Sequence, residues 1–401
     1  FSLLEADAFG RGDRDALYTW VEIAAAAAQP GAERRGRTEI ALRRIRRADP
    51  AGLRVAVVAE RALAEATARP GLDLDDFLRL LDAWCARSGL ETGWAEHPRY
   101  SLGPLGQLVR PERVSGPVAA QWADAGHLLL VGEAVFHGLE LLLLSEVERY
   151  SLAWPGEASP LEIAVAGQGR SSRRNLASGG TIFHGFYVRA DLLRLGAQGL
   201  DQRAREVRLP LPGIDLPDGL DPPADDGRLP EDWDLPLRLH ARLLQGEPLA
   251  FDLERELLLL HEAGHLPDVL RWLPDGPSFL RTLPAVIHSL LASGDAMTWL
   301  EYRAAARALA ATPHPRWALA DLVRTVRGGT PRYRSAYTWL LEDLIELGAA
   351  RQLPAFYRWD EVEPAVLTEM ARELCHQQGL ETLPAGPVAE LLRAVSASER
   401  P

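Results

Sequence analysis

The chain has 401 residues, more than one hydrophobic core usually organises, so we expect two or three packed units. With 47% apolar and 25% charged residues, its composition is typical of a soluble globular protein and excludes a disordered or fibrous one. The net charge of −12 opposes nonspecific nucleic-acid binding, which needs uncompensated Lys and Arg on the surface.

Two cysteines, Cys85 and Cys375, exclude a disulfide framework and disfavour a Cys-based zinc site. This cysteine usage favours the reducing cytoplasm. The leucine-rich runs Leu141 to Leu144 and Leu257 to Leu260 are too short to span a bilayer, so no membrane association is expected.

Residues 1–115 are predicted to form an N-terminal helical bundle or repeat array, because helical patterns alternate with Pro- and Gly-containing breaks. These patterns cover Leu17 to Ala28, Thr38 to Ala48 and Leu53 to Ala68, and the helical texture reaches about Leu105. Such a region could contact a protein partner, although no residue in it identifies one.

Residues 116–208 are predicted to contain a helix and a small β region. The strongly apolar stretch Gly138 to Leu144 indicates one long buried helix within Val118 to Ala153. Two β-leaning pieces, Leu161 to Ala166 and Thr181 to Val188, predict a small hairpin or sheet.

The segment 209–236 is rich in Pro and Asp and is predicted to be an extended linker. After it, residues 237–401 are predicted to form one α-helical domain, so the fold as a whole is expected to be mainly α. The expected helices are Leu237 to Leu244, Asp252 to Leu273, Pro277 to Ala292, Ala296 to Ala310, Trp317 to Val326, Ser335 to Leu347, Glu363 to Gln378 and Val388 to Ser396.

One segment of that domain carries a chemical pattern, His261-Glu262-Ala263-Gly264-His265. On a helix, residues four apart share a face, so His261 and His265 can direct two imidazoles at one divalent ion. Glu262 lies about 100° round the helix and can take a proton from a metal-activated water. Gly264 is explained if something approaches the helix closely, and Pro267 is expected to kink or end the helix after His265.

A metal centre needs a third protein ligand, and Glu301 and His288 are the leading candidates downstream, with Asp295 between them. Glu301 opens a predicted helical run. His288 lies among apolar neighbours, where a histidine is commonly a hydrogen-bonded core residue. Both alternatives stay open from the sequence.

With Glu301 as third ligand, the pattern resembles the gluzincin group of HExxH zinc metallopeptidases over His261 to about Ala310. The resemblance implies a zincin-like metal domain, a Zn²⁺ cofactor, Glu262 as general base and a peptide or protein substrate. Many gluzincins place an Asp four residues after the glutamate ligand to steady a motif histidine. Here that position is Ala305, so the support would have to come from elsewhere.

A peptidase also needs a donor for the developing oxyanion, and Tyr333 is the first candidate, followed by Tyr337. In HExxH peptidases a β-strand commonly edges the cleft and pairs with extended substrate. Thr181 to Val188 is the strand predicted for that place.

Two other functions remain open. With His288 as third ligand, the site would suit Fe²⁺ and resemble 2-oxoglutarate-dependent HExxH peptide hydroxylases, with Arg303 or Arg334 binding the cosubstrate carboxylate. Alternatively, the chain is a non-catalytic helical interaction protein in which the motif is accidental.

Overall fold

The structure, a computed structural model, describes residues 50–96, 99–101, 107–109, 117–134, 138–157, 160–172, 178–182, 185–194, 196–197, 200, 250–272, 296–354 and 356–398. The chain divides into two compact units. The first comprises Phe1–Glu148 and Ala166–Leu176, and the second comprises Arg149–Val165 and Ala177–Pro401.

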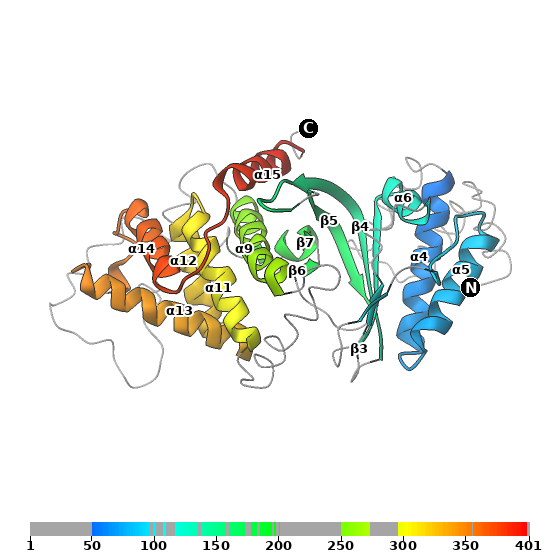
Figure 1. The fold of residues 1–401 in the computed structure, drawn as a ribbon, viewed down its shortest axis with the longest axis horizontal. Coiled ribbons are helices and arrows are strands. Elements are labelled where there is room, and N and C mark those ends of the chain that lie inside the picture. Colours follow the sequence, from blue (N-terminus) through cyan, green and yellow to red (C-terminus); the bar gives the residue numbers. More distant parts are fainter. Residues whose placement is uncertain are drawn as a thin grey trace, which may run out of the picture. The chain divides into compact units, whose positions relative to one another are not determined.

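The first unit packs helices against antiparallel strands. Its described helices are α4 (Pro50–Ala68), α5 (Leu74–Arg87) and α6 (Pro117–Asp124), and α5 begins where the Asp73 carboxylate accepts the backbone N–H of Asp75. Its strands β1 (Arg99–Ser101), β2 (Gln107–Val109) and β3 (His127–Ala134) and the greater part of β4 (Gly138–Leu152) pair consecutively. Figure 1 shows α4, α5 and α6 beside one another. The helical prediction for Leu53 to Ala68 is thus confirmed, whereas β1 lies where helix was expected.

The long helix predicted around Gly138 to Leu144 is wrong, because this stretch forms β4 and pairs with β3. Leu141, Leu142, Leu143 and Leu144 are all buried, so both faces of the strand are covered. A strand buried on both faces has no polar alternation and reads like a buried helix in sequence.

The second unit contains a hairpin, β6 (Gly179–Ile182) and β7 (Gly185–Arg189), together with the beginning of β5 (Leu161–Ser171). Among the described strands the sheet order is β1-β2-β3-β4-β5-β7-β6, which leaves β6 at an edge. The strand predicted over Thr181 to Val188 is therefore two strands, and the β region is a larger sheet than the small insert expected.

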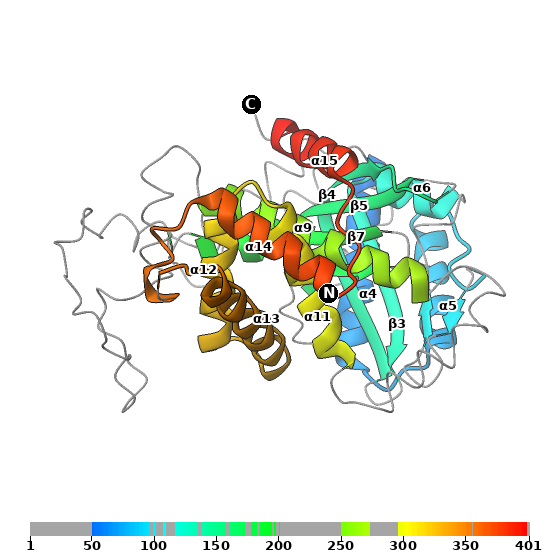
Figure 2. The same ribbon diagram turned by 60° about the vertical axis from the view of Figure 1, so that its left-hand side comes forward.

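Beyond these strands, the described part of the second unit is mostly helical, and the expected concentration of helices toward the C-terminus is confirmed. Helix α9 is buried on several sides, since it contacts β6 and β7 as well as α11. Figure 2 shows the same elements turned by 60°, with α9 again beside α11. The helices are α9 (Ala250–Trp272), α11 (Ala296–Ala311), α12 (Pro315–Gly328), α13 (Pro331–Ala350), α14 (Pro364–Gln377) and α15 (Ala385–Ser398), with the short 3₁₀ helix η4 (Phe356–Arg358) before α14.

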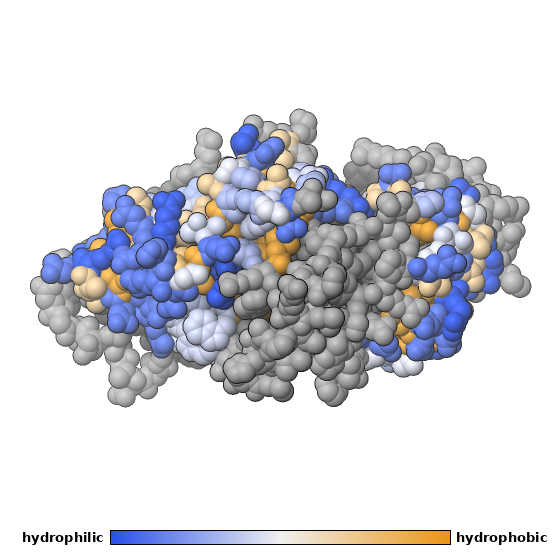
Figure 3. Space-filling model, in the orientation of Figure 1, coloured by the Kyte–Doolittle hydropathy of each residue, from blue (hydrophilic) through white to orange (hydrophobic). Residues whose placement is uncertain are grey.

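Proline at the first helical position defines the start of three of these helices. Pro315, Pro331 and Pro364 begin α12, α13 and α14, where the missing N–H costs no helical hydrogen bond. These helices turn a largely hydrophilic surface outward on the face shown in Figure 3. Among the described residues, no helix combines the length and the apolar character needed to cross a membrane.

Candidate metal centre

The candidate site lies where α9 and α11 approach each other closely. An ideal Cβ on Gly264 would come within 2.7 Å of the backbone oxygen of Ala304 and 2.9 Å of its Cα. Any larger residue at 264 would therefore push the two helices apart. The close approach expected at Gly264 is thus made by the backbone of α11, and it brings Glu301 toward the two motif histidines.

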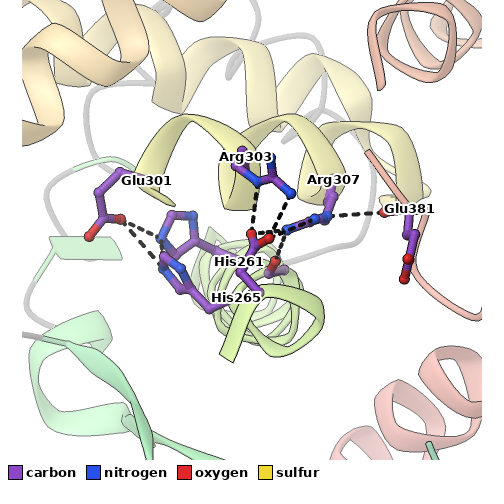
Figure 4. A network of polar contacts seen from close by, with 8 residues as sticks. His261, His265, Glu301, Arg303, Arg307 and Glu381 are labelled. Atoms are coloured by element: carbon purple, nitrogen blue, oxygen red, sulfur yellow. Dashed lines mark hydrogen bonds and ion pairs between the residues drawn. The ribbon is translucent and has the colours of Figure 1, made fainter. Parts of the chain in front are cut away.

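Three ligand-type atoms from these helices converge on one point, as Figure 4 shows. The Nε2 atoms of His261 and His265 lie 3.3 Å apart. Glu301 Oε2 lies 3.1 Å from His261 Nε2 and 3.5 Å from His265 Nε2. Among the described residues, this is the one group of three or more His, Cys, Asp and Glu side chains with metal-binding geometry.

The triangle has the size that a zinc ion requires. Zinc bonds imidazole nitrogen and carboxylate oxygen at about 2.0–2.2 Å, so neighbouring ligand atoms in a tetrahedral site lie roughly 3.3–3.6 Å apart. The three measured separations, 3.1, 3.3 and 3.5 Å, are close to that range. Two histidines and one glutamate also leave the fourth position free for water or substrate, as in catalytic zinc sites.

Without a cation, the negative charge of Glu301 and the two histidines shift the pKa values within the group. Burial lowers the pKa of His261, but the hydrogen bond to Glu301 and its negative charge outweigh burial, so the net pKa is raised. Burial raises the pKa of Glu301, yet hydrogen bonds from His261 and His265 hold it well below its usual range. The carboxylate is therefore ionised and ready to coordinate a cation.

Glu262 is buried and rests against the edge strand β6. An ideal Cβ on Gly179 would lie 2.7 Å from Glu262 Oε1, so the absence of a side chain at 179 makes room for this carboxylate. Its negative charge also contributes to the raised pKa of His261, which places the carboxylate near the histidine.

Tyr337 lies behind His261 rather than on the side of the converging ligands. Its hydroxyl oxygen is 3.5 Å from His261 Nδ1, the ring nitrogen that does not face Glu301. A contact to this histidine, which Ala305 cannot make, is thus made from α13, one turn beyond the more exposed Tyr333. The ring centroids of Tyr333 and Tyr337 are 6.3 Å apart.

The helix predicted over Asp252 to Leu273 is confirmed, since α9 does not end at Pro267 and continues to Trp272. Beyond the proline, the buried carboxylate of Asp268 binds Arg303 and Arg307 of α11. Arg307 Nη1 also donates to the carbonyl oxygen of Gly264 at 2.7 Å. These contacts join the two helices just past the motif.

The two arginines considered for a cosubstrate carboxylate both make hydrogen bonds within the protein. Arg303 binds Asp268 through two nitrogens, and Arg334 donates to the carbonyl oxygen of Gly329 at 3.1 Å. His288 and Asp295 lie outside the described residues, as do the linker 209–236 and the predicted elements Leu17 to Ala28, Thr38 to Ala48, Leu237 to Leu244 and Pro277 to Ala292.

The sequence prediction missed the roles of Gly179, Asp268 and Arg307. A signal for Arg307 was present, because Arg303 and Arg307 are four residues apart and share a face of α11. The place of Gly179 beside Glu262 had no local signal, since it depends on how strand and helix pack.

No protein-family model matches this chain, and neither curated proteins nor solved structures show significant similarity to it.

Proposed function

We propose that the chain is a zinc-dependent metallopeptidase with a zincin-like catalytic centre. The observation that carries the proposal is the triangle of His261 Nε2, His265 Nε2 and Glu301 Oε2, whose sides of 3.1–3.5 Å suit one tetrahedral ion. The three side chains come from two helices in tight backbone contact, which favours a preorganised centre.

Each residue has a chemical task in this proposal. His261, His265 and Glu301 would hold a zinc ion, which would supply the Lewis acidity that makes a water molecule a good nucleophile at neutral pH. Glu262 would accept a proton from the attacking water as its oxygen bonds to the carbonyl carbon, and would deliver that proton to the amine nitrogen as the C–N bond breaks. Tyr333 donates a hydrogen bond to the carbonyl oxygen as negative charge develops on it.

The substrate would bind as an extended chain along β6, the last strand of the described order on the side of β7. The backbone N–H and C=O groups of β6 that face away from β7 would pair with the peptide backbone. Because Glu262 packs on Gly179 of this strand, a peptide bound there would run close to the general base.

The arrangement favours zinc hydrolysis over the iron and 2-oxoglutarate alternative. Two histidines and one carboxylate also bind Fe²⁺ in oxygenases, so the ligand set by itself does not separate the two functions. The preference for zinc rests on the two arginines considered for the cosubstrate carboxylate: Arg303 is bound to Asp268, and Arg334 donates to the carbonyl oxygen of Gly329. Turnover of 2-oxoglutarate by iron-loaded protein would overturn this preference.

The mechanism is tested by Glu262→Gln, with Glu256→Gln on the same helix as control. We expect Glu262→Gln to keep one zinc per chain and to lose at least about 100-fold in cleavage of a fluorogenic peptide library, the usual contribution of a general base. The Glu256 carboxylate accepts from Thr312 instead, so its variant should keep both properties. Full turnover by Glu262→Gln would exclude this mechanism.

A further inference from the structure

We propose that Asp268, Arg303 and Arg307 are positioning residues that hold α11 in the register at which Glu301 reaches the two histidines. The inference rests on the proposed metal site and assigns that site a determinant outside the metal-binding residues.

In this cluster, two arginines each make bidentate contacts to one buried carboxylate. Arg303 donates from Nε to Asp268 Oδ2 at 3.0 Å and from Nη2 to Oδ1 at 2.7 Å. Arg307 donates from Nη1 to Oδ2 at 2.6 Å and from Nη2 to Oδ1 at 3.4 Å. Asp268 and Arg307 are each 1% exposed, so water offers them no alternative partner.

Arg307 also donates hydrogen bonds to the backbone of two other segments. Besides binding Asp268, it donates to the carbonyl oxygen of Gly264 at 2.7 Å and to that of Glu381 at 3.0 Å. Gly264 directly precedes the ligand His265 and is the point of contact with Ala304. Figure 4 shows the arginines and Glu301 projecting from the same helix toward α9.

Glu301 and the two arginines move together because all three lie on helix α11. Arg303 and Arg307 follow Glu301 on α11, and Asp268 follows His265 on α9. A slide of α11 by a single residue shifts its side chains by about 1.5 Å. Since a zinc–oxygen bond is about 2.0–2.2 Å long, such a slide would remove Glu301 from coordination.

Buried ion pairs contribute little net stability, so a role in stability alone is a weak account of this cluster. Charged groups held in fixed geometry are better suited to setting a register. The bidentate contacts of two arginines one turn apart define both the spacing and the rotation of α11 relative to α9.

A double-mutant cycle between Arg303→Gln and Glu301→Gln tests the proposal, with zinc affinity measured by competition with a chelating indicator. We expect each single variant to weaken zinc binding at least ten-fold, and Arg303→Gln to cause little further loss when Glu301 is already replaced. In cobalt-substituted protein, Arg303→Gln should shift the visible d–d bands toward those of Glu301→Gln.

Equal losses from Arg303→Gln in both backgrounds would mean a general structural role and overturn the proposal. A loss only with Glu301→Gln would also overturn it while leaving the metal site intact. If Glu301→Gln leaves zinc affinity unchanged, the proposed metal site is wrong, and the role proposed for Arg303 is then wrong as well. Arg303→Lys, which keeps the charge but not the two-pronged contact, replaces Arg303→Gln in the cycle if the latter does not fold. Arg351→Gln, which breaks an exposed ion pair with Glu373, serves as the control with unchanged affinity.

Discussion

His261 has a partner on each ring nitrogen, and this fixes which nitrogen can bind an ion. Nε2 faces Glu301 and His265, and Nδ1 faces the Tyr337 hydroxyl. To coordinate through Nε2, the neutral ring must carry its proton on Nδ1. That N–H can then donate to the Tyr337 oxygen, as the outer nitrogens of zinc-binding histidines commonly do with nearby acceptors.

We therefore expect Tyr337→Phe to weaken zinc binding by about 10- to 100-fold, the usual cost of losing a hydrogen-bond partner of a metal ligand. Titration calorimetry or chelator competition measures this directly. Tyr333→Phe is the matched control, since Tyr333 lies one turn earlier and is 36% exposed. Equal zinc affinity in wild type and Tyr337→Phe would show that the 3.5 Å contact does not support His261.

At the scale of elements, β6 combines two glycines that make room on opposite faces of one strand. A Cβ at Gly179 would meet Glu262 Oε1 at 2.7 Å, and a Cβ at Gly180 would meet the ring of Tyr187 at 2.8 Å. Side chains of neighbouring strand residues point to opposite faces, so these two glycines serve different contacts.

Replacing each glycine by alanine separates these contacts. Gly179→Ala should displace the Glu262 carboxylate and lower peptide cleavage about 100-fold or more, with zinc content retained. Gly180→Ala should move Tyr187 instead and leave more of the activity. Kinetics on the fluorogenic library, with zinc quantified in the same samples, compares the two. Equal effects of both variants would argue that Gly179 has no special relation to the general base.

The accuracy of the sequence prediction depended on whether a feature was local. His261, His265 and their helix could be predicted because four-residue spacing defines a shared face. The strand β4 could not be, because burial on both faces removed the alternation that marks a strand. The contact between Glu301 and the histidines depends on the packing of α9 on α11, so the sequence allowed Glu301 and His288 as alternatives.

At the scale of the whole molecule, buried titratable groups link stability to pH. Burial raises the pKa of both Glu254 and Glu256 to about 7, above their value in an unfolded chain. Between those two values the folded state binds more protons than the unfolded state, so stability decreases as pH rises. The raised pKa of His261 acts in the same direction, because its stabilising charge is lost as pH rises through that pKa.

The zinc-free protein is accordingly expected to unfold at a lower temperature at pH 8 than at pH 6. Each of the two glutamates contributes on the order of 1 kcal/mol to this difference. Asp268 and Glu301, whose pKa values are lowered, are ionised throughout this range and add no slope. Calorimetry of chelator-treated protein measures the effect. A higher unfolding temperature at pH 8 would contradict the raised pKa values of Glu254 and Glu256. Added zinc should stabilise the protein more at pH 8 than at pH 6, because the ion competes with protons for histidine.

The metal site itself is tested most directly by a zinc-edge anomalous difference map from crystals of zinc-loaded protein. We expect one strong peak at about 2.0–2.2 Å from His261 Nε2, His265 Nε2 and a Glu301 carboxylate oxygen. A zinc-loaded crystal with no peak at these three residues, or with a peak bound to the histidines but not to Glu301, would contradict it.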